Sequence, residues 1–299
     1  MNDSTEKWEV RFEKALVYND VSEAIKILEE RNKFSGTPRG VDKVKALEAV
    51  LRLGMTPDES HHWANRLLDN DSAAARDLAA MLTVTFIAPL YTLQPVAAEE
   101  IILRIADDTH WEVREDADNV MLQIVKVDFT KAYNQLKKWA THPSENVRRA
   151  VVMTAKKAGR ERRPEWACPL LDLLELLLND RSAYVRKNLG PFAIGDGFLR
   201  YYPALTLQYL DQWSKMSDEQ VRWNVAMAFS SAEAAKYIDA ALPILERLAS
   251  DERRFVWRAV ASAMRNLGRR VPDRIIPVLE RWLEDELRVR PAQIAFKYI

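Results

Sequence analysis

The segment Trp111-Glu112-Val113-Arg114-Glu115 recurs along this sequence in four altered copies. The copies are Glu145-Asn146-Val147-Arg148-Arg149, Ala183-Tyr184-Val185-Arg186-Lys187, Glu219-Gln220-Val221-Arg222-Trp223 and the more divergent Arg254-Phe255-Val256-Trp257-Arg258. Ala73-Ala74-Ala75-Arg76-Asp77 is a candidate for an earlier copy. The anchor valines are 34, 38, 36 and 35 residues apart. A period of this length with two helices per unit is typical of stacked helix pairs.

Each copy has the same anatomy. An apolar helix ends in a polar turn, and a second helix begins at once with a serine or aspartate that can cap its free N–H groups. The anchor valine and the apolar residues three to four positions later form a buried stripe. The pattern therefore predicts an all-α fold, a right-handed α-solenoid of about six to seven HEAT-like helix pairs with a concave inner face.

Composition narrows the function classes. Only 8 of the 299 residues are glycine, and no P-loop, dinucleotide fingerprint or nucleophile elbow occurs. Cys168 is the single cysteine, which excludes an intramolecular disulfide and a thiolate zinc site. Its apolar surroundings predict a small core residue. The four histidines lack metal-ligand spacing, so we expect neither a metal nor a cofactor.

The repeats predict a single domain, 1–299, in which 96–299 forms regular repeats and 1–95 an atypical N-terminal helical cap. Apolar periodicity in the cap predicts helices over 6–17, 21–32, 41–53 and 57–68. The segment Gly36-Thr37-Pro38-Arg39-Gly40 is the expected break between them.

The first six residues contain neither a basic nor an apolar segment of a signal peptide. The longest apolar stretch, Ala79 to Tyr91, is too short to cross a bilayer and contains Thr83, Thr85 and Pro89. We therefore expect a cytoplasmic protein with no membrane partner. A monomer is expected, as for many solenoids of this size.

Charge suggests where a partner binds. The formal net charge is +0, which counts mildly against nucleic acid, yet a local patch sets the field at a binding face. The residue two positions after each anchor valine is expected on the inner side or its rim. These positions carry Glu115, Arg149, Lys187, Trp223 and Arg258.

Two clusters of cations lie nearby in the sequence. One runs from Arg148 to Arg163 and includes Lys156 and Lys157; the other runs from Arg253 to Arg270. They suit a phosphate backbone, where counterion release supplies much of the affinity. They equally suit ordinary solvated faces. For the first arginine of each copy, the simpler interpretation is a surface ladder that packs against turn carboxylates of neighbouring repeats.

At this point the residues resemble a known family, the AlkD/AlkC-type DNA alkylation repair glycosylases built of HEAT-like repeats. Trp111 and Glu115 resemble the Trp and catalytic acid that lie four positions apart on one helix face. Asn146-Val147-Arg148-Arg149-Ala150 resembles the segment whose second cation contacts the DNA backbone. Tyr184-Val185-Arg186-Lys187-Asn188-Leu189-Gly190 resembles the next repeat. The likeness covers roughly 95 to 235.

The resemblance implies a DNA N-glycosylase that hydrolyses the N-glycosidic bond of cationic 3-methyl and 7-methyl purines in double-stranded DNA, damaged or branched. Glu115 would stabilise the oxocarbenium-like sugar and Trp111 would form an aromatic wall. Arg149 and Lys187 would clamp phosphates, and the predicted DNA-binding set is completed by Arg148, Lys156, Lys157, Trp223 and Arg258.

The sequence departs from the family at one position: Pro191, with Phe192 beside it, stands where a second aromatic residue is expected. Trp223, Tyr201 or Tyr202 are candidate substitutes. Two other functions remain open, a HEAT-repeat protein that binds DNA without excising bases and a scaffold that binds proteins. Glu115 as a solvated helix acid, and Trp111 as a packing aromatic, are the corresponding structural interpretations.

Overall fold

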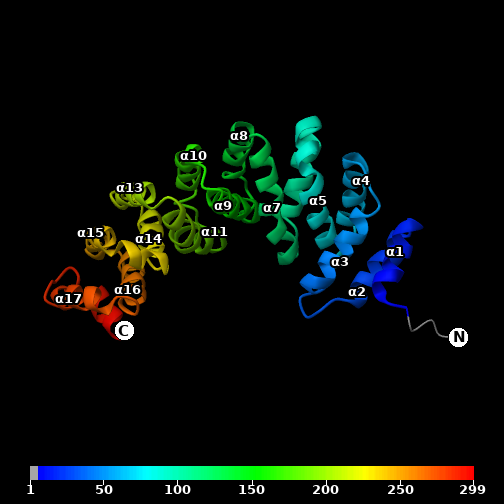
Figure 1. Cartoon of the computed structure of the whole chain (residues 1–299). Helices are drawn as coiled ribbons and strands as arrows, with labels where there is room; N and C mark the ends of the chain where they lie inside the picture. Colours follow the sequence, from blue (N-terminus) through cyan, green and yellow to red (C-terminus); the bar gives the residue numbers. More distant parts are fainter. Residues whose placement is uncertain (1–5) are drawn as a thin grey trace. The chain divides into compact units, whose positions relative to one another are not determined.

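The computed structural model describes residues 6–299 and is an all-α solenoid of stacked helix pairs (Figure 1). Seven pairs follow one another from α4 to α18, as the repeat predicts. Within 6–299 no β-strand occurs, and Asn32 and Pro38 form an isolated bridge. By its internal packing the chain divides into unit 1, which ends at Ala132, and unit 2, Tyr133–Ile299. This boundary falls inside a helix, and the single domain stays a prediction.

Unit 1 contains the predicted cap helices and the first regular repeat. The helices are α1 (Trp8–Val17), α2 (Val21–Glu30), α3 (Gly40–Leu51), α4 (Pro57–Leu68), α5 (Ala73–Leu93), α6 (Pro95–Ala106) and α7 (Trp111–Val127). The predicted break lies between α2 and α3. The next helix, α8 (Phe129–Trp139), crosses from one unit to the other.

Helix α5 is longer than its apolar stretch. It has 21 residues and contains an 18-residue window with a mean hydropathy of 1.4, and among the described residues it is the one helix whose length and composition could span a membrane. The sequence-based prediction of a stretch too short to do so is therefore wrong. However, 61% of that apolar window is buried, and α5 packs on α4, α6 and α7. Its apolarity is that of a core helix.

Unit 2 consists of two rows of helices (Figure 1). The first row is α10 (Pro164–Glu175), α13 (Pro203–Ser214), α15 (Ile238–Ala249) and α17 (Pro272–Leu283). The second row is α9 (Glu145–Arg160), α11 (Ala183–Asn188), α14 (Glu219–Ala228), α16 (Arg254–Gly268) and α18 (Val289–Phe296). Helix α11 continues as the π-helical segment η1 (Leu189–Phe198) and the short α12 (Leu199–Tyr201), and the 3-10 turn η2 (Glu233–Tyr237) precedes α15.

The predicted side-chain caps are present at α9, α11 and α14 but not at α7 or α16. Ser144 accepts from Asn146 N, Ser182 from Tyr184 N and Val185 N, and Asp218 from Gln220 N and Val221 N. The anchor valines behind them, at 113, 147, 185, 221 and 256, are buried. The buried stripe is thus common to all five copies, and the side-chain cap to three of them.

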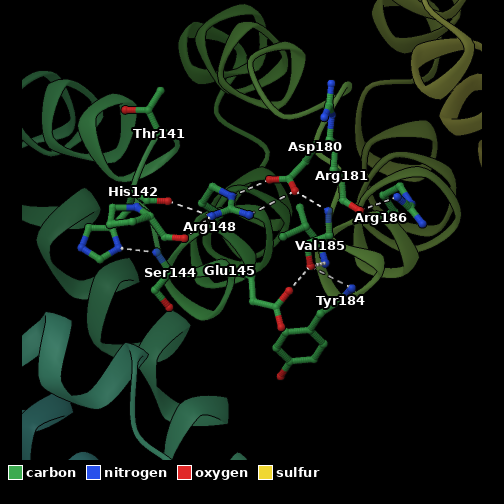
Figure 2. Close-up of polar contacts among 12 residues, drawn as sticks. Thr141, His142, Ser144, Glu145, Arg148, Asp180, Arg181, Tyr184, Val185 and Arg186 are labelled. Carbon is green, nitrogen blue, oxygen red and sulfur yellow. Dashed lines mark hydrogen bonds and ion pairs between the residues drawn. The ribbon is translucent and has the colours of Figure 1, made fainter.

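The first arginine forms the predicted ladder where the next turn carries a carboxylate. Arg148 donates to the carbonyl oxygens of His142 and Pro143 in its own turn, each at 2.8 Å. Its other nitrogens reach the Asp180 carboxylate of the next turn at 2.6 and 3.2 Å (Figure 2). Arg76 binds Asp108 in the same way, and Arg222 binds Asp251 at 2.7 Å. Each such guanidinium joins two successive turns.

Carboxylates occupy only alternate turns. The equivalent turn positions carry Asn70, Asp108, His142, Asp180, Met216 and Asp251. Most of these side chains also accept from the backbone N–H two residues later, as Asp180 does from Ser182 N at 2.8 Å and His142 Nδ1 from Ser144 N at 3.1 Å. At His142 and Met216 the negative charge is missing, so the ladder alternates between charged and uncharged turns.

Two glycines of η1 permit close helix packing. A Cβ on Gly195 would lie 2.3 Å from the Ala228 carbonyl oxygen, and one on Gly190 would lie 2.7 Å from that of Asn224. No other residue fits where backbones approach this closely. Gly190, which contributes to the family resemblance, therefore has a packing role between η1 and α14.

Replacing Arg148 by Ala is expected to lower the free energy of unfolding by roughly 2–4 kcal/mol, because it leaves Asp180, with a side chain 5% exposed, without its charged partner. Urea denaturation measures the change. Lys215→Ala is the control, since its ion pair with Asp211 is exposed and contributes little. Equal losses in the two variants would show that the ladder is not a major source of stability.

Candidate nucleic-acid interface

Charges in unit 2 are sorted between the two rows of helices. The first row carries the carboxylates Glu165, Asp172, Glu175, Asp211, Asp239, Glu246, Asp273 and Glu280, against Arg247, Arg274 and Arg281. In the second row, helices α9, α11, α14 and α16 carry cations at 148, 149, 156, 157, 160, 186, 187, 222, 254, 258 and 265, against Glu145 and Glu219. The neutral chain therefore contains a distinctly basic layer.

Several cations of this layer have no anionic partner in the structure. Lys187, Arg254 and Arg258 are exposed, and none of them makes an ion pair within residues 6–299. Arg186 donates to the Arg181 carbonyl and likewise has no carboxylate partner there. The arginines of the first row, by contrast, are paired: Arg247 with Asp211, Arg274 with Asp239 and Arg281 with Glu246. The second row thus presents uncompensated positive charge.

Aromatic side chains lie among these cations. The rings of Trp223 and Phe255 are stacked, with centroids 5.7 Å apart and planes inclined by 12°. The Arg186 guanidinium lies 6.0 Å from the Phe255 ring, and the Lys187 ammonium 5.0 Å from the Tyr184 ring. Of the residues predicted to bind DNA from the sequence, Lys187, Trp223 and Arg258 lie beside these rings on α11, α14 and α16. Phe255 is not predicted from the sequence, and Arg254 is predicted only as a member of the second cation cluster.

Arg149 does not lie where the sequence predicts. It is 6% exposed, and its guanidinium lies 5.2 Å from the Tyr184 ring. The sequence predicts it on the inner side or its rim, but the side chain is buried, because α9 is buried around most of its circumference, from Arg149 through Ala155. The sequence also predicts that the neighbouring Arg148 binds DNA. Its guanidinium is instead bound to Asp180 in the ladder.

Lys156 and Lys157 are half-buried. The Lys156 ammonium lies 3.1 Å from Asp196 and 2.9 Å from the centre of the Phe192 ring. Burial lowers the pKa of Lys156 despite the hydrogen bond to Asp196. Phe192, next to Pro191, is 40% exposed. Its ring covers the Lys156 ammonium. The ion pair already satisfies Lys156, which makes it a poorer phosphate ligand than Lys187.

Trp111 and Glu115 are both exposed on α7, one turn apart, and Trp111 is 53% exposed. The indole stacks on His110, with centroids 6.3 Å apart. Trp111 is therefore not a core residue. The two side chains belong to unit 1 and Arg149 to unit 2, and their convergence on one nucleotide stays a prediction.

Unit 1 contains a polar cluster that the sequence does not predict. Lys43 of α3 binds Asp77 of α5 at 2.9 Å and Glu112 of α7 at 2.5 Å, and Thr37 also donates to Glu112. Burial raises the pKa of Asp77 to about 6, against the opposing effect of Lys43. Burial also acts to raise the pKa of Glu112. The hydrogen bonds from Lys43 and Thr37 outweigh this effect and lower the pKa of Glu112 to about 2. The cluster joins three helices.

Cys168 is exposed rather than buried. Helix α10 buries Trp166, Ala167, Leu170 and Leu171, and the position of Cys168 falls on the opposite face. In the part of the chain that the structure describes, no three His, Cys, Asp or Glu side chains gather as a metal site would require.

No family model and no curated protein matches the sequence. Among solved structures, smu.31 from Streptococcus mutans UA159 aligns with a TM-score of 0.48 and 17% identity, covering 74% of this chain and 96% of that one. YibA of Escherichia coli aligns at 0.40 and 18%, covering 99% and 98%. A designed armadillo repeat protein aligns at 0.31 and 20%, covering 70% and 100%.

The unit 1 cluster predicts a pH effect. Between the ordinary pKa of Asp77, 3.8, and its value of about 6 in the fold, the folded state binds more protons than the unfolded state. Stability contributed by Asp77 therefore falls as pH rises through this window. Asp77→Asn removes that fall, so the unfolding free energy of the variant minus that of the wild type should rise by up to roughly 3 kcal/mol from pH 4 to pH 7.

Urea denaturation across this pH range, at constant ionic strength, measures the difference. Glu48→Gln serves as the control, because it removes one exposed carboxylate of the neighbouring turn of α3. A constant difference between wild type and Asp77→Asn would mean that Asp77 does not titrate in this window.

Proposed function

We propose that this protein binds DNA through the basic layer of unit 2. The observation that carries the proposal is the set of exposed cations without carboxylate partners, Lys187, Arg254 and Arg258, beside the stacked rings of Trp223 and Phe255. Such cations gain most from a polyanion, because no ion pair must be broken and condensed counterions are released. The neutral net charge does not oppose binding, since only the local field matters at contact.

A protein-binding scaffold is the main alternative for a solenoid. A protein interface favours an apolar centre with few charges. The second row instead offers cations spread over α11 and α16 and isolated aromatic rings. This distribution suits a backbone of repeated phosphates better than a protein surface.

We further propose, from the resemblance to AlkD/AlkC-type enzymes, that the bound DNA is a substrate. The lesion would be a cationic N3- or N7-alkylated purine, which is already a good leaving group, so catalysis needs no general acid. As the N-glycosidic bond breaks, positive charge builds on the sugar, and the Glu115 carboxylate would stabilise it. Trp111 would face the cationic base. The exposure of both side chains on α7 favours this second proposal.

Arg258→Ala is expected to weaken binding to duplex DNA of any sequence and to reduce the slope of log affinity against log salt by about 1, the contribution of one phosphate contact. Fluorescence anisotropy at a series of salt concentrations measures both. Arg281→Ala is the matched control, because Arg281 lies in the first row and is paired with Glu246. Loss of affinity in the control but not in Arg258→Ala would refute the assignment of the face.

Glu115→Gln is expected to reduce release of 3-methyladenine or 7-methylguanine from methylated duplex DNA on the order of a hundredfold or more, while DNA affinity is retained. Chromatography of the released bases measures the rate. Unaltered release in the variant would exclude Glu115 as the catalytic carboxylate. If the wild type binds DNA but releases no base, it is a DNA-binding protein without glycosylase activity.

A further inference from the structure

A pocket of about 540 Å³ lies between α14 and α16, wholly within unit 2. Its lining residues are Trp223, Met227, Arg254, Phe255, Arg258, Ala259 and Ser262. The volume is within the range of small-molecule sites. The stacked rings of Trp223 and Phe255 come from successive repeats, so this surface exists only where two helix pairs meet.

The pocket lining has an apolar part and a positively charged part. Two rings and the side chains of Met227 and Ala259 give an apolar surface, while Arg254 and Arg258 supply two guanidinium groups without hydrogen-bond or ion-pair partners in 6–299. None of the lining residues is a carboxylate. A ligand that satisfies both parts has a flat apolar portion and an anionic one.

A nucleotide has this combination, with a base that stacks and a phosphate that binds arginine. A paired base inside a duplex is stacked on both sides and presents only its edges, so it cannot lie against a protein ring. An unpaired nucleotide exposes its π-face, and proteins that hold single strands combine aromatic rings with a basic groove. Arg186, beside Phe255, and Lys187 on the same helix extend the positive charge toward α11.

We propose that this pocket binds one unpaired nucleotide of the DNA, with its base on the rings of Trp223 and Phe255 and its phosphate on Arg254 and Arg258. The inference rests on the proposed DNA binding and specifies the form of DNA. A bulge, a gap or a branch supplies such a nucleotide. The protein therefore prefers DNA in which pairing is interrupted.

The experiment compares two probes, a 20-base-pair duplex and the same duplex with one central unpaired 2-aminopurine. Wild type is expected to bind the bulged probe on the order of tenfold more tightly and to quench 2-aminopurine fluorescence through stacking. Trp223→Leu and Phe255→Leu should each lose the preference for the bulged probe and the quenching of 2-aminopurine. Phe34→Leu is the control, because Phe34 is a fully exposed ring of unit 1.

Each result has one meaning. If wild type binds both probes equally, or if Trp223→Leu and Phe255→Leu retain the quenching, the pocket is not a nucleotide site, although DNA binding stands. If wild type binds neither probe at low salt, DNA binding itself fails and the inference falls with it. Circular dichroism of both variants, compared with wild type, verifies that a lost preference does not result from unfolding.

Discussion

The solenoid depends on the bond between an arginine and the turn of the next repeat. A helix pair cannot bury both its faces alone and must stack on a neighbour. Stacking of apolar stripes is not directional, whereas Arg148 reaches two carbonyl groups of its own turn and both oxygens of Asp180. This geometry sets the register of one pair on the next. It also explains why a short motif persists in a sequence whose other residues vary between copies.

The same constraint separates the arginines that are held in the ladder from the exposed cations of the second helices. Arg76, Arg148 and Arg222 are occupied by the ladder, because the next turn carries a carboxylate in each case. Lys187, Arg254 and Arg258 have no carboxylate partner within 6–299, and most carboxylates on the helices of unit 2 lie in the first row. The distribution of charge over the two rows therefore depends on which face each helix turns to the core.

The fold was predictable because its determinants are local and repeated: a cap, a buried valine and an arginine at fixed spacing. The candidate site was less predictable from the sequence. Lys187 and Arg258 are exposed, as their offset after the valine suggests, but the same offset buries Arg149, since α9 is enclosed by its neighbours. The contact of Trp223 with Phe255 joins different offsets of successive repeats, and the Lys43 cluster joins helices outside the repeat. No spacing rule predicts either.

The sorting of acids and bases between the rows gives unit 2 an electric dipole moment, although the whole chain is neutral. Unit 2 itself has 28 Lys and Arg residues against 20 Asp and Glu, so a polyanion attracts it, and the dipole adds a torque close to the polyanion. The unit would turn its second helices toward a nearby phosphate chain before touching it. Because this orientation acts only within a Debye length, about 8 Å in physiological salt, it would aid capture of a strand already encountered rather than the search for it.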